Sequence, residues 1–289
     1  MKRWHLFALV CTALALFAGC ATLDEKQREW IFQPGNRSWG GVEAPADMQD
    51  VWIDFASRAS GKPARLHGLW LPADADADAK PGKADKAPVL LYLHGARWNV
   101  AGSSFRVRRM QELGFSVLAI DYRGFGKSTN ELPSEDMAYE DARAAWDWLA
   151  AQYPERPRYI FGHSLGGAIA IDLAAQVDDE RGTIVEGTFT SIPDVASSFK
   201  WGWLPVGPFI TQRFESMRKV ARVGSPLLVV HGSNDNLIKP ELGRRLFEAA
   251  TGPKLFVEVE GGSHHNTNSM GQGQYRQALA QLFGWPATR

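Results

Sequence analysis

A Gly-x-Ser-x-Gly turn, with a strand-like run before it and a helix-like run after it, constrains this chain more than any other feature. Apolar residues 159–161 lead into Gly162-His163-Ser164-Leu165-Gly166, and an Ala- and Ile-rich run over 168–176 follows. Such a tight turn holds its serine in strained backbone geometry, and side chains in place of the two glycines would clash with the neighbouring strand or helix. Free N–H groups at the start of the following helix face developing negative charge. The pattern predicts a nucleophilic Ser164; the alternative is a glycine-rich turn with an incidental serine.

The spacing of apolar runs predicts the architecture around this turn. Short continuous apolar runs are typical of strands buried on both faces of a sheet. Helix-like stretches separate them, and this alternation predicts an α/β protein whose mostly parallel sheet has helices on both faces. Residues 50–57 and 65–71 instead alternate between apolar and polar, which predicts an antiparallel hairpin at the start. The expected buried strands cover residues 89–93, 117–120, 159–161, 183–185, 227–230 and 255–259, and the expected helices cover 104–113, 135–151, 240–250 and 275–283.

The N-terminal residues have the pattern of an export signal. Two basic residues precede the apolar run Leu6–Phe17, which is too short for a comfortable membrane span. Small residues directly before Cys20 resemble a bacterial lipobox, so we expect residues 1–19 to be a lipoprotein signal peptide and Cys20 to carry lipid. Ala21, where an aspartate would favour the inner membrane, points to an outer-membrane anchor facing the periplasm. The alternative is an ordinary secretory signal.

Composition adds two constraints. The only other cysteine, Cys11, lies within the expected signal, so the mature chain would form no internal disulfide. The formal net charge of +0 does not favour nucleic acid as a partner. We therefore expect a tether and N-terminal arm over residues 20–48, followed by one α/β domain over residues 49–289. Within it, residues 73–86 predict an exposed loop, and the aromatic-rich residues 189–222 predict a short cap.

A nucleophilic serine needs a histidine base and a carboxylate that orients the histidine. Asp235 is the favoured acid because it directly follows the strand-like residues 227–230, and loops at the carboxyl ends of parallel strands form ligand sites. Its alternative role is turn formation, since its neighbours are turn-rich. Glu186 and Asp194, which follow the preceding strand, are rival acids.

The base lies in the segment after the last strand, where two histidines are adjacent. The spacing after Gly261-Gly262 favours His264, with His265 as the reserve. A metal site built from the pair is disfavoured, because adjacent residues do not readily face one ion and no acidic or cysteine residue stands beside them. The backbone N–H groups of Leu165 and Ala96 are the expected oxyanion-hole donors.

Taken in order, these segments resemble the landmarks of the α/β-hydrolase superfamily, from about Asp50 to the C-terminus. Within it, the chain is similar to the branch of bacterial lipoprotein-like hydrolases and protein depalmitoylases. The resemblance implies a Ser164–Asp235–His264 triad and no cofactor. The landmarks are Leu93-His94-Gly95, Asp121-Tyr122-Arg123-Gly124-Phe125-Gly126-Lys127-Ser128, Gly162–Gly167, His231–Asp235 and His264, with 189–194 and 213–216 fitting the branch.

The predicted function is hydrolysis of carboxylic esters or thioesters of lipid-like acyl substrates. The aromatic residues of 189–222 could line an acyl pocket, or they could pack the cap onto the domain. One alternative function is peptide hydrolysis by the same fold. The other is a non-catalytic envelope lipoprotein, disfavoured because a binding module needs no ordered serine, acid and histidine.

Overall fold

The computed structural model describes residues 19, 21–35, 45–73, 87–199 and 202–285. The expected lipidation site Cys20, residues 1–18 of the expected signal and most of the predicted loop 73–86 therefore lie outside the described residues. Among the described residues, no helix has the length and hydropathy of a membrane span.

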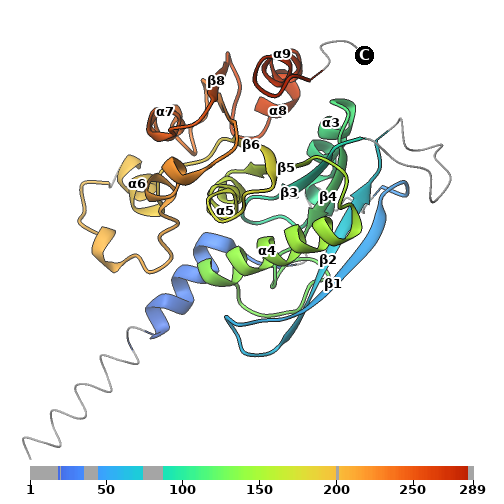
Figure 1. The fold of residues 1–289 in the computed structure, drawn as a ribbon. Coiled ribbons are helices and arrows are strands. Elements are labelled where there is room, and N and C mark those ends of the chain that lie inside the picture. The colour runs from blue at the N-terminus through green and yellow to red at the C-terminus, as the bar shows by residue number, and fades with distance from the viewer. Residues whose placement is uncertain (1–18, 20, 36–44, 74–86, 200–201, 286–289) are drawn as a thin grey trace, which may run out of the picture.

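An eight-stranded sheet forms the centre of the domain (Figure 1). The strand order is β1-β2-β4-β3-β5-β6-β7-β8. Strand β2 is antiparallel to both β1 and β4, and all other neighbours are parallel, which confirms the predicted fold class and opening hairpin. The strands are β1 (Gln49–Ala56), β2 (Pro63–Leu71), β3 (Val89–Leu93), β4 (Ser116–Ile120), β5 (Arg158–His163), β6 (Glu180–Glu186), β7 (Leu227–Gly232) and β8 (Lys254–Val259).

Helices cover both faces of the sheet. On one face, α3 (Ser104–Glu112) and α9 (Gln272–Phe283) bury a core with the aromatic side chains of Phe115 and Tyr159. On the other face, α4 (Glu135–Gln152), α5 (Leu165–Ala174) and α7 (Pro240–Ala249) close the larger core. Since both faces are covered, all five residues of β3 and all five of β4 are buried, as their continuous apolar runs predict.

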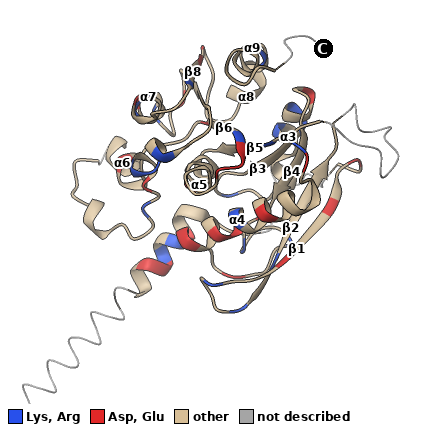
Figure 2. Cartoon of the chain, in the orientation of Figure 1, with Lys and Arg blue, Asp and Glu red and all other residues tan. Residues whose placement is uncertain are grey.

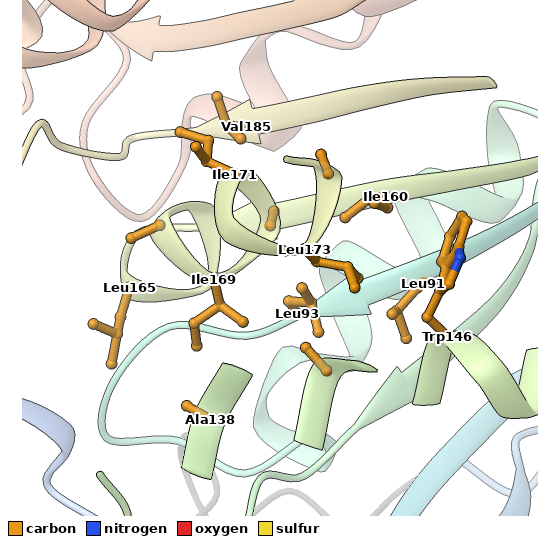
Figure 3. Close-up of a cluster of buried hydrophobic side chains, with 14 of the residues drawn as sticks. Leu91, Leu93, Ala138, Trp146, Ile160, Leu165, Ile169, Ile171, Leu173 and Val185 are labelled. Carbon is orange, nitrogen blue, oxygen red and sulfur yellow. The ribbon is translucent and has the colours of Figure 1, made fainter. Parts of the chain in front are cut away.

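Helix α5 lies against the middle of the sheet (Figure 3). Every one of its residues is buried, and Ile169 and Leu173 pack in one core with Leu93 of β3 and Trp146 of α4. Its apolar character on all sides is what a helix between a sheet and a second helix requires. The packing fixes the start of α5, and therefore the position of Ser164 directly before it.

Residues 187–226 leave the sheet between β6 and β7. They contain helix α6 (Ile192–Ser198) and three short 3-10 helices, Gly207–Phe209, Ser216–Arg218 and Val220–Arg222. Ser191 caps α6 by accepting a hydrogen bond from the backbone N–H of Asp194. This excursion contains the expected cap, residues 189–222.

The residues that follow the expected lipidation site include a helix that packs on the domain. Residues 21–32 form a helix, shown in blue in Figure 1, that lies beside the excursion between β6 and β7. The Gln27 side chain donates to the carbonyl of Phe209 and accepts from the N–H of Thr211. The aromatic ring of Phe32 is completely buried, edge-to-face with Phe214. Part of the segment expected as tether and N-terminal arm is therefore a helix whose polar residues bind the domain.

Candidate active site

Ser164 lies between the end of β5 and the first residue of α5, with φ 55° and ψ −119°. Positive φ is unusual for a residue with a side chain and marks local backbone strain. The turn is possible only with glycine on both sides: a Cβ at Gly162 would lie 2.2 Å from the carbonyl oxygen of Gly166, and one at Gly166 would lie 2.1 Å from that of Leu93. The structure therefore has the strained strand–turn–helix geometry that the sequence predicts.

Three side chains from separate strand ends meet in one hydrogen-bonded line. The Nε2 atom of His264 lies 3.0 Å from Ser164 Oγ, and its Nδ1 atom lies 2.7 Å from Asp235 Oδ2. Ser164 follows β5, Asp235 follows β7 and His264 follows β8, so all three stand at the carboxyl edge of the parallel sheet. The line has the geometry in which a histidine can take a proton from the serine while the carboxylate fixes its tautomer.

The carboxylate of Asp235 is almost completely buried and strongly hydrogen-bonded. Its Oδ1 atom accepts from the backbone N–H groups of Leu237 and Ile238, at 2.9 and 2.8 Å. Burial alone would raise the pKa of Asp235, but hydrogen bonds from His231 and His264 outweigh it and hold that pKa below its usual value of 3.8. Asp235 therefore favours its ionised form at neutral pH, where its Oδ2 atom lies 2.7 Å from Nδ1 of His264.

The alternative acids, Glu186 and Asp194, and the alternative base, His265, have other partners. Glu186 pairs with Arg106 at 3.3 Å and accepts from the hydroxyl of Tyr275, while Asp194 accepts from Thr190 in the cap. The ring of His265 stands at 83° to that of His264, and burial together with the nearby charge of His264 lowers the pKa of His265. His264 is thus the histidine that contacts both Ser164 and Asp235.

The expected oxyanion-hole segments also lie beside Ser164. A Cβ added to Gly95 would come 3.1 Å from the Cβ of Ser164, so the loop that follows β3 touches the serine. Ala96 and Leu165 both line the same pocket as Ser164. Leu165 is the first residue of α5, where backbone N–H groups have no partner within the helix. Both segments thus lie beside Ser164.

A buried arginine, which the sequence analysis does not single out, holds the His264 segment in place. Arg106 is 5% exposed, and its Nη2 atom donates to the carbonyl oxygens of His264 and His265 at 3.2 and 3.1 Å. The same atom lies 3.2 Å from Nε2 of His163. Burial, and then the charges of Arg106 and His264, lower the pKa of His163 well below its usual value. This environment favours the neutral form of His163, whose Nε2 atom also lies 3.0 Å from the carbonyl oxygen of His264. The sequence carried one signal for Arg106: it stands four residues before Met110, on the buried side of α3.

A largely apolar pocket of about 810 Å³ opens above Ser164. Its size falls within the range of small-molecule sites. The described residues that line it include no aspartate and no glutamate, and its two cationic side chains are Arg97 and Arg106. Within the described parts of the chain, no cluster of three or more potential metal ligands occurs. The walls come from helix 21–32, the loop after β3, the excursion between β6 and β7, and the loop after β7. Their apolar side chains are Trp30, Ile31, Trp98, Phe189, Ile192, Val195, Phe199, Leu204, Val206, Leu237 and Ile238.

Known proteins resemble this chain over most of its length. The family described as serine aminopeptidase, S33, matches residues 84–214, a span that includes Ser164 and ends before Asp235. An uncharacterized protein of Mycobacterium tuberculosis is 35% identical over 272 residues, which cover 92% of this chain and 90% of that protein. The lysophosphatidylserine lipase ABHD12 of Danio rerio is 32% identical over 209 residues, which cover 65% of this chain but only 54% of the lipase.

Among solved structures, the esterase Pf2001 of Pyrococcus furiosus superposes with a TM-score of 0.66 at 20% sequence identity. The superposition covers 88% of this chain and 99% of the esterase. At this level of identity the likeness concerns the fold alone, and it agrees with the strand order and the placement of helices described above.

Proposed function

The chain belongs to the α/β-hydrolase superfamily of serine hydrolases, and we propose that it cleaves carboxylic esters or thioesters of lipid-like acyl substrates. The observation that carries the proposal is the contact of His264 with both Ser164 and Asp235 at the floor of an apolar pocket. The lysophosphatidylserine lipase among the similar proteins supports the same reaction class.

In the proposed mechanism, His264 Nε2 takes the proton of Ser164 as Oγ attacks the acyl carbonyl carbon. The tetrahedral oxyanion accepts hydrogen bonds from the backbone N–H groups of Ala96 and Leu165. Collapse breaks the bond to the leaving alcohol or thiol, which receives the proton from His264, and leaves an acyl group on Ser164. Water, deprotonated by His264, then hydrolyses this acyl-enzyme and restores the serine. Asp235 stabilises the charged histidine in both halves of the reaction.

The test is labelling of the folded chain with a fluorophosphonate probe. Wild-type protein and the control Ser197→Ala, which alters an exposed serine of α6, should be labelled; Ser164→Ala should not, and it should lose ester hydrolysis. Folded wild-type protein that does not react would refute an activated serine. A panel of esters and thioesters with acyl chains of different lengths then identifies the preferred substrate.

Peptide hydrolysis is the second candidate, because the matching family is described as serine aminopeptidase. An aminopeptidase has to bind the cationic amino terminus of its substrate, for which a carboxylate is the natural partner. The absence of acidic residues among the described lining residues favours acyl esters over free peptides. Aminoacyl nitroanilides tested beside nitrophenyl esters separate the two: turnover of the anilides at a similar kcat/KM would favour the peptidase.

We also propose that Cys20 carries the lipid anchor and that the mature chain acts at the bacterial envelope, facing the periplasm from the outer membrane. The support is the small-residue sequence before Cys20 and the apolar run Leu6–Phe17. Incorporation of labelled palmitate by the wild type but not by Cys20→Ser would support it. Equal incorporation by both would reject it.

A further inference from the structure

Exposed apolar side chains concentrate at one place on the described surface. Twelve large hydrophobic side chains are exposed among the described residues, and seven of them belong to helix 21–32 or to residues 199–210. Trp203 is 73% exposed, and both Trp30 and Phe209 are 67% exposed. Single exposed apolar residues are ordinary, whereas a cluster of this kind marks an interaction surface. We define the apolar rim as Trp30, Phe199, Trp203, Leu204, Val206 and Phe209.

The apolar rim surrounds the mouth of the active-site pocket. Trp30, Phe199, Leu204 and Val206 all line that pocket while remaining partly exposed. The same side chains therefore connect the outer surface to the space above Ser164.

Helix 21–32 and the loop after α6 are joined into one surface. The Asp24 carboxylate accepts from the side chains of Thr211 and Gln212, and Gln27 binds the backbone of Phe209 and Thr211. Figure 2 shows that the loop after α6 carries almost no charged side chains. In the sequence, Lys200 is the single charged residue between 199 and 210. The loop side of this surface is apolar, and helix 21–32 adds Trp30 beside the exposed charged residues Glu25 and Lys26. Hydrogen bonds hold the two segments together.

The position of the apolar rim along the chain indicates what covers it. The apolar run Leu6–Phe17 and Cys20 directly precede helix 21–32. Ten residues of α-helix are about 15 Å long, so Trp30 stands within that distance of the start of the helix. Tryptophan and phenylalanine are the side chains that prefer the boundary between lipid headgroups and acyl chains.

We propose that the apolar rim docks on the surface of a phospholipid bilayer, so that the pocket mouth opens toward the lipid and takes acyl substrates from it. The rim is a second membrane contact, separate from the N-terminal anchor, and it sets the orientation of the anchored domain. The use of the pocket for acyl groups rests on the proposed function; the docking itself does not.

The first test measures orientation on phosphatidylcholine vesicles with the full chain. An environment-sensitive fluorescent amino acid replaces Phe209 in one protein and Trp52, an exposed residue of β1 at the opposite edge of the sheet, in the control. Vesicles with brominated acyl chains should quench the probe at 209 and leave the probe at 52 unchanged. No quenching at 209, or equal quenching at both positions, would overturn the proposal. So would a probe that is already shielded without lipid in a protein that sediments as a dimer, because a second copy would then cover the rim.

The second test separates docking from chemistry. Trp203 and Phe209 do not line the pocket, so the double variant Trp203→Ser, Phe209→Ser should hydrolyse a soluble short-chain ester at the wild-type rate. Its rate on a long-chain ester embedded in vesicles should fall about tenfold or more. Unchanged vesicle activity would reject the docking and leave the proposed function intact. If the wild type hydrolysed neither ester, the proposed function would fail, and the fluorescence experiment would still decide the docking.

Discussion

At the scale of single residues, Asp235 is a buried anion that two histidines and two backbone N–H groups hold in place. Asp235→Asn keeps the shape but removes the charge and favours the wrong histidine tautomer. We expect kcat for an ester to fall by about 10⁴, the loss seen when a triad carboxylate is replaced in this way. Steady-state kinetics on the purified variant measure it. Asp194→Asn, which changes the rival acid in the cap, is the control and should retain activity; an equal loss in both would reassign the acid.

The lowered pKa of Asp235 also predicts a dependence on pH. A carboxyl whose pKa is lower in the folded protein stabilises it at pH values above its unfolded pKa, and this stability is lost as the pH falls toward the folded pKa. The difference in unfolding free energy between wild type and Asp235→Asn should therefore be constant from pH 7 to 5 and shrink below about pH 4. Urea unfolding across this range checks it. A difference that grows toward low pH would contradict the assignment.

Arg106 is a buried cation that binds the backbone of the segment containing His264. In Arg106→Met, Glu186 would lose its ion pair and the carbonyls of His264 and His265 would lose a donor. Breaking a buried pair from one side costs about 3–5 kcal/mol of stability, and we expect kcat to fall while KM for a short ester changes little. The control is Arg109→Met on the same helix, whose exposed pair with Glu112 contributes at most about 1 kcal/mol. Similar losses in both variants would refute the role of Arg106.

At the scale of elements, the first turn of α4 holds the end of the cap excursion. The Glu135 carboxylate accepts from the backbone N–H groups of Arg213 and Phe214, at 2.7 and 2.9 Å, and from the hydroxyl of Tyr139. Glu135→Ala leaves these donors without a partner and should lower the free energy of unfolding by roughly 2 kcal/mol. Asp136→Ala, in the same turn but exposed, loses only the helix-dipole interaction, about 0.5 kcal/mol. Urea unfolding of both variants gives the comparison; equal losses would mean that Glu135 acts only through the dipole.

The elements of the central sheet could be predicted because their own residues carry the pattern. Strands β3 and β4 are continuous apolar runs, and the order of strands and helices along the chain leaves few topologies. Helix 21–32 could not be predicted, since its polar side chains are explained only by distant partners, as Gln27 with Thr211, 184 residues away, shows. The candidate active site shows the same contrast between local and distant contacts. The elbow around Ser164 is local in sequence, whereas the contacts of Arg106 with His163 and His264 span 57 and 158 residues.

At the scale of the whole molecule, the pocket exists only because distant segments close around Ser164. Trp30 and Ile31 come from the N-terminal helix, Val195 and Ala196 from α6, and Leu237 from the loop after β7. No single element supplies enough apolar surface to hold an acyl chain. A change that fills this space should therefore affect substrates by their length, because long chains need the far wall and short chains do not.

Ala196→Trp places a large ring in this space and leaves Ser164, Asp235 and His264 themselves unchanged. We expect kcat/KM for esters of long acyl chains to fall about tenfold or more, since each buried methylene contributes about 0.8 kcal/mol to binding. Esters of two to four carbons should retain their rates. Ala151→Trp, at an exposed position near the end of α4, adds the same ring outside the pocket and should leave the whole series unchanged. A uniform loss across all lengths in Ala196→Trp would mean that the ring disturbs Ser164 itself, and an unchanged series would mean that acyl chains bind elsewhere. Only a loss that grows with chain length assigns the pocket to the acyl group.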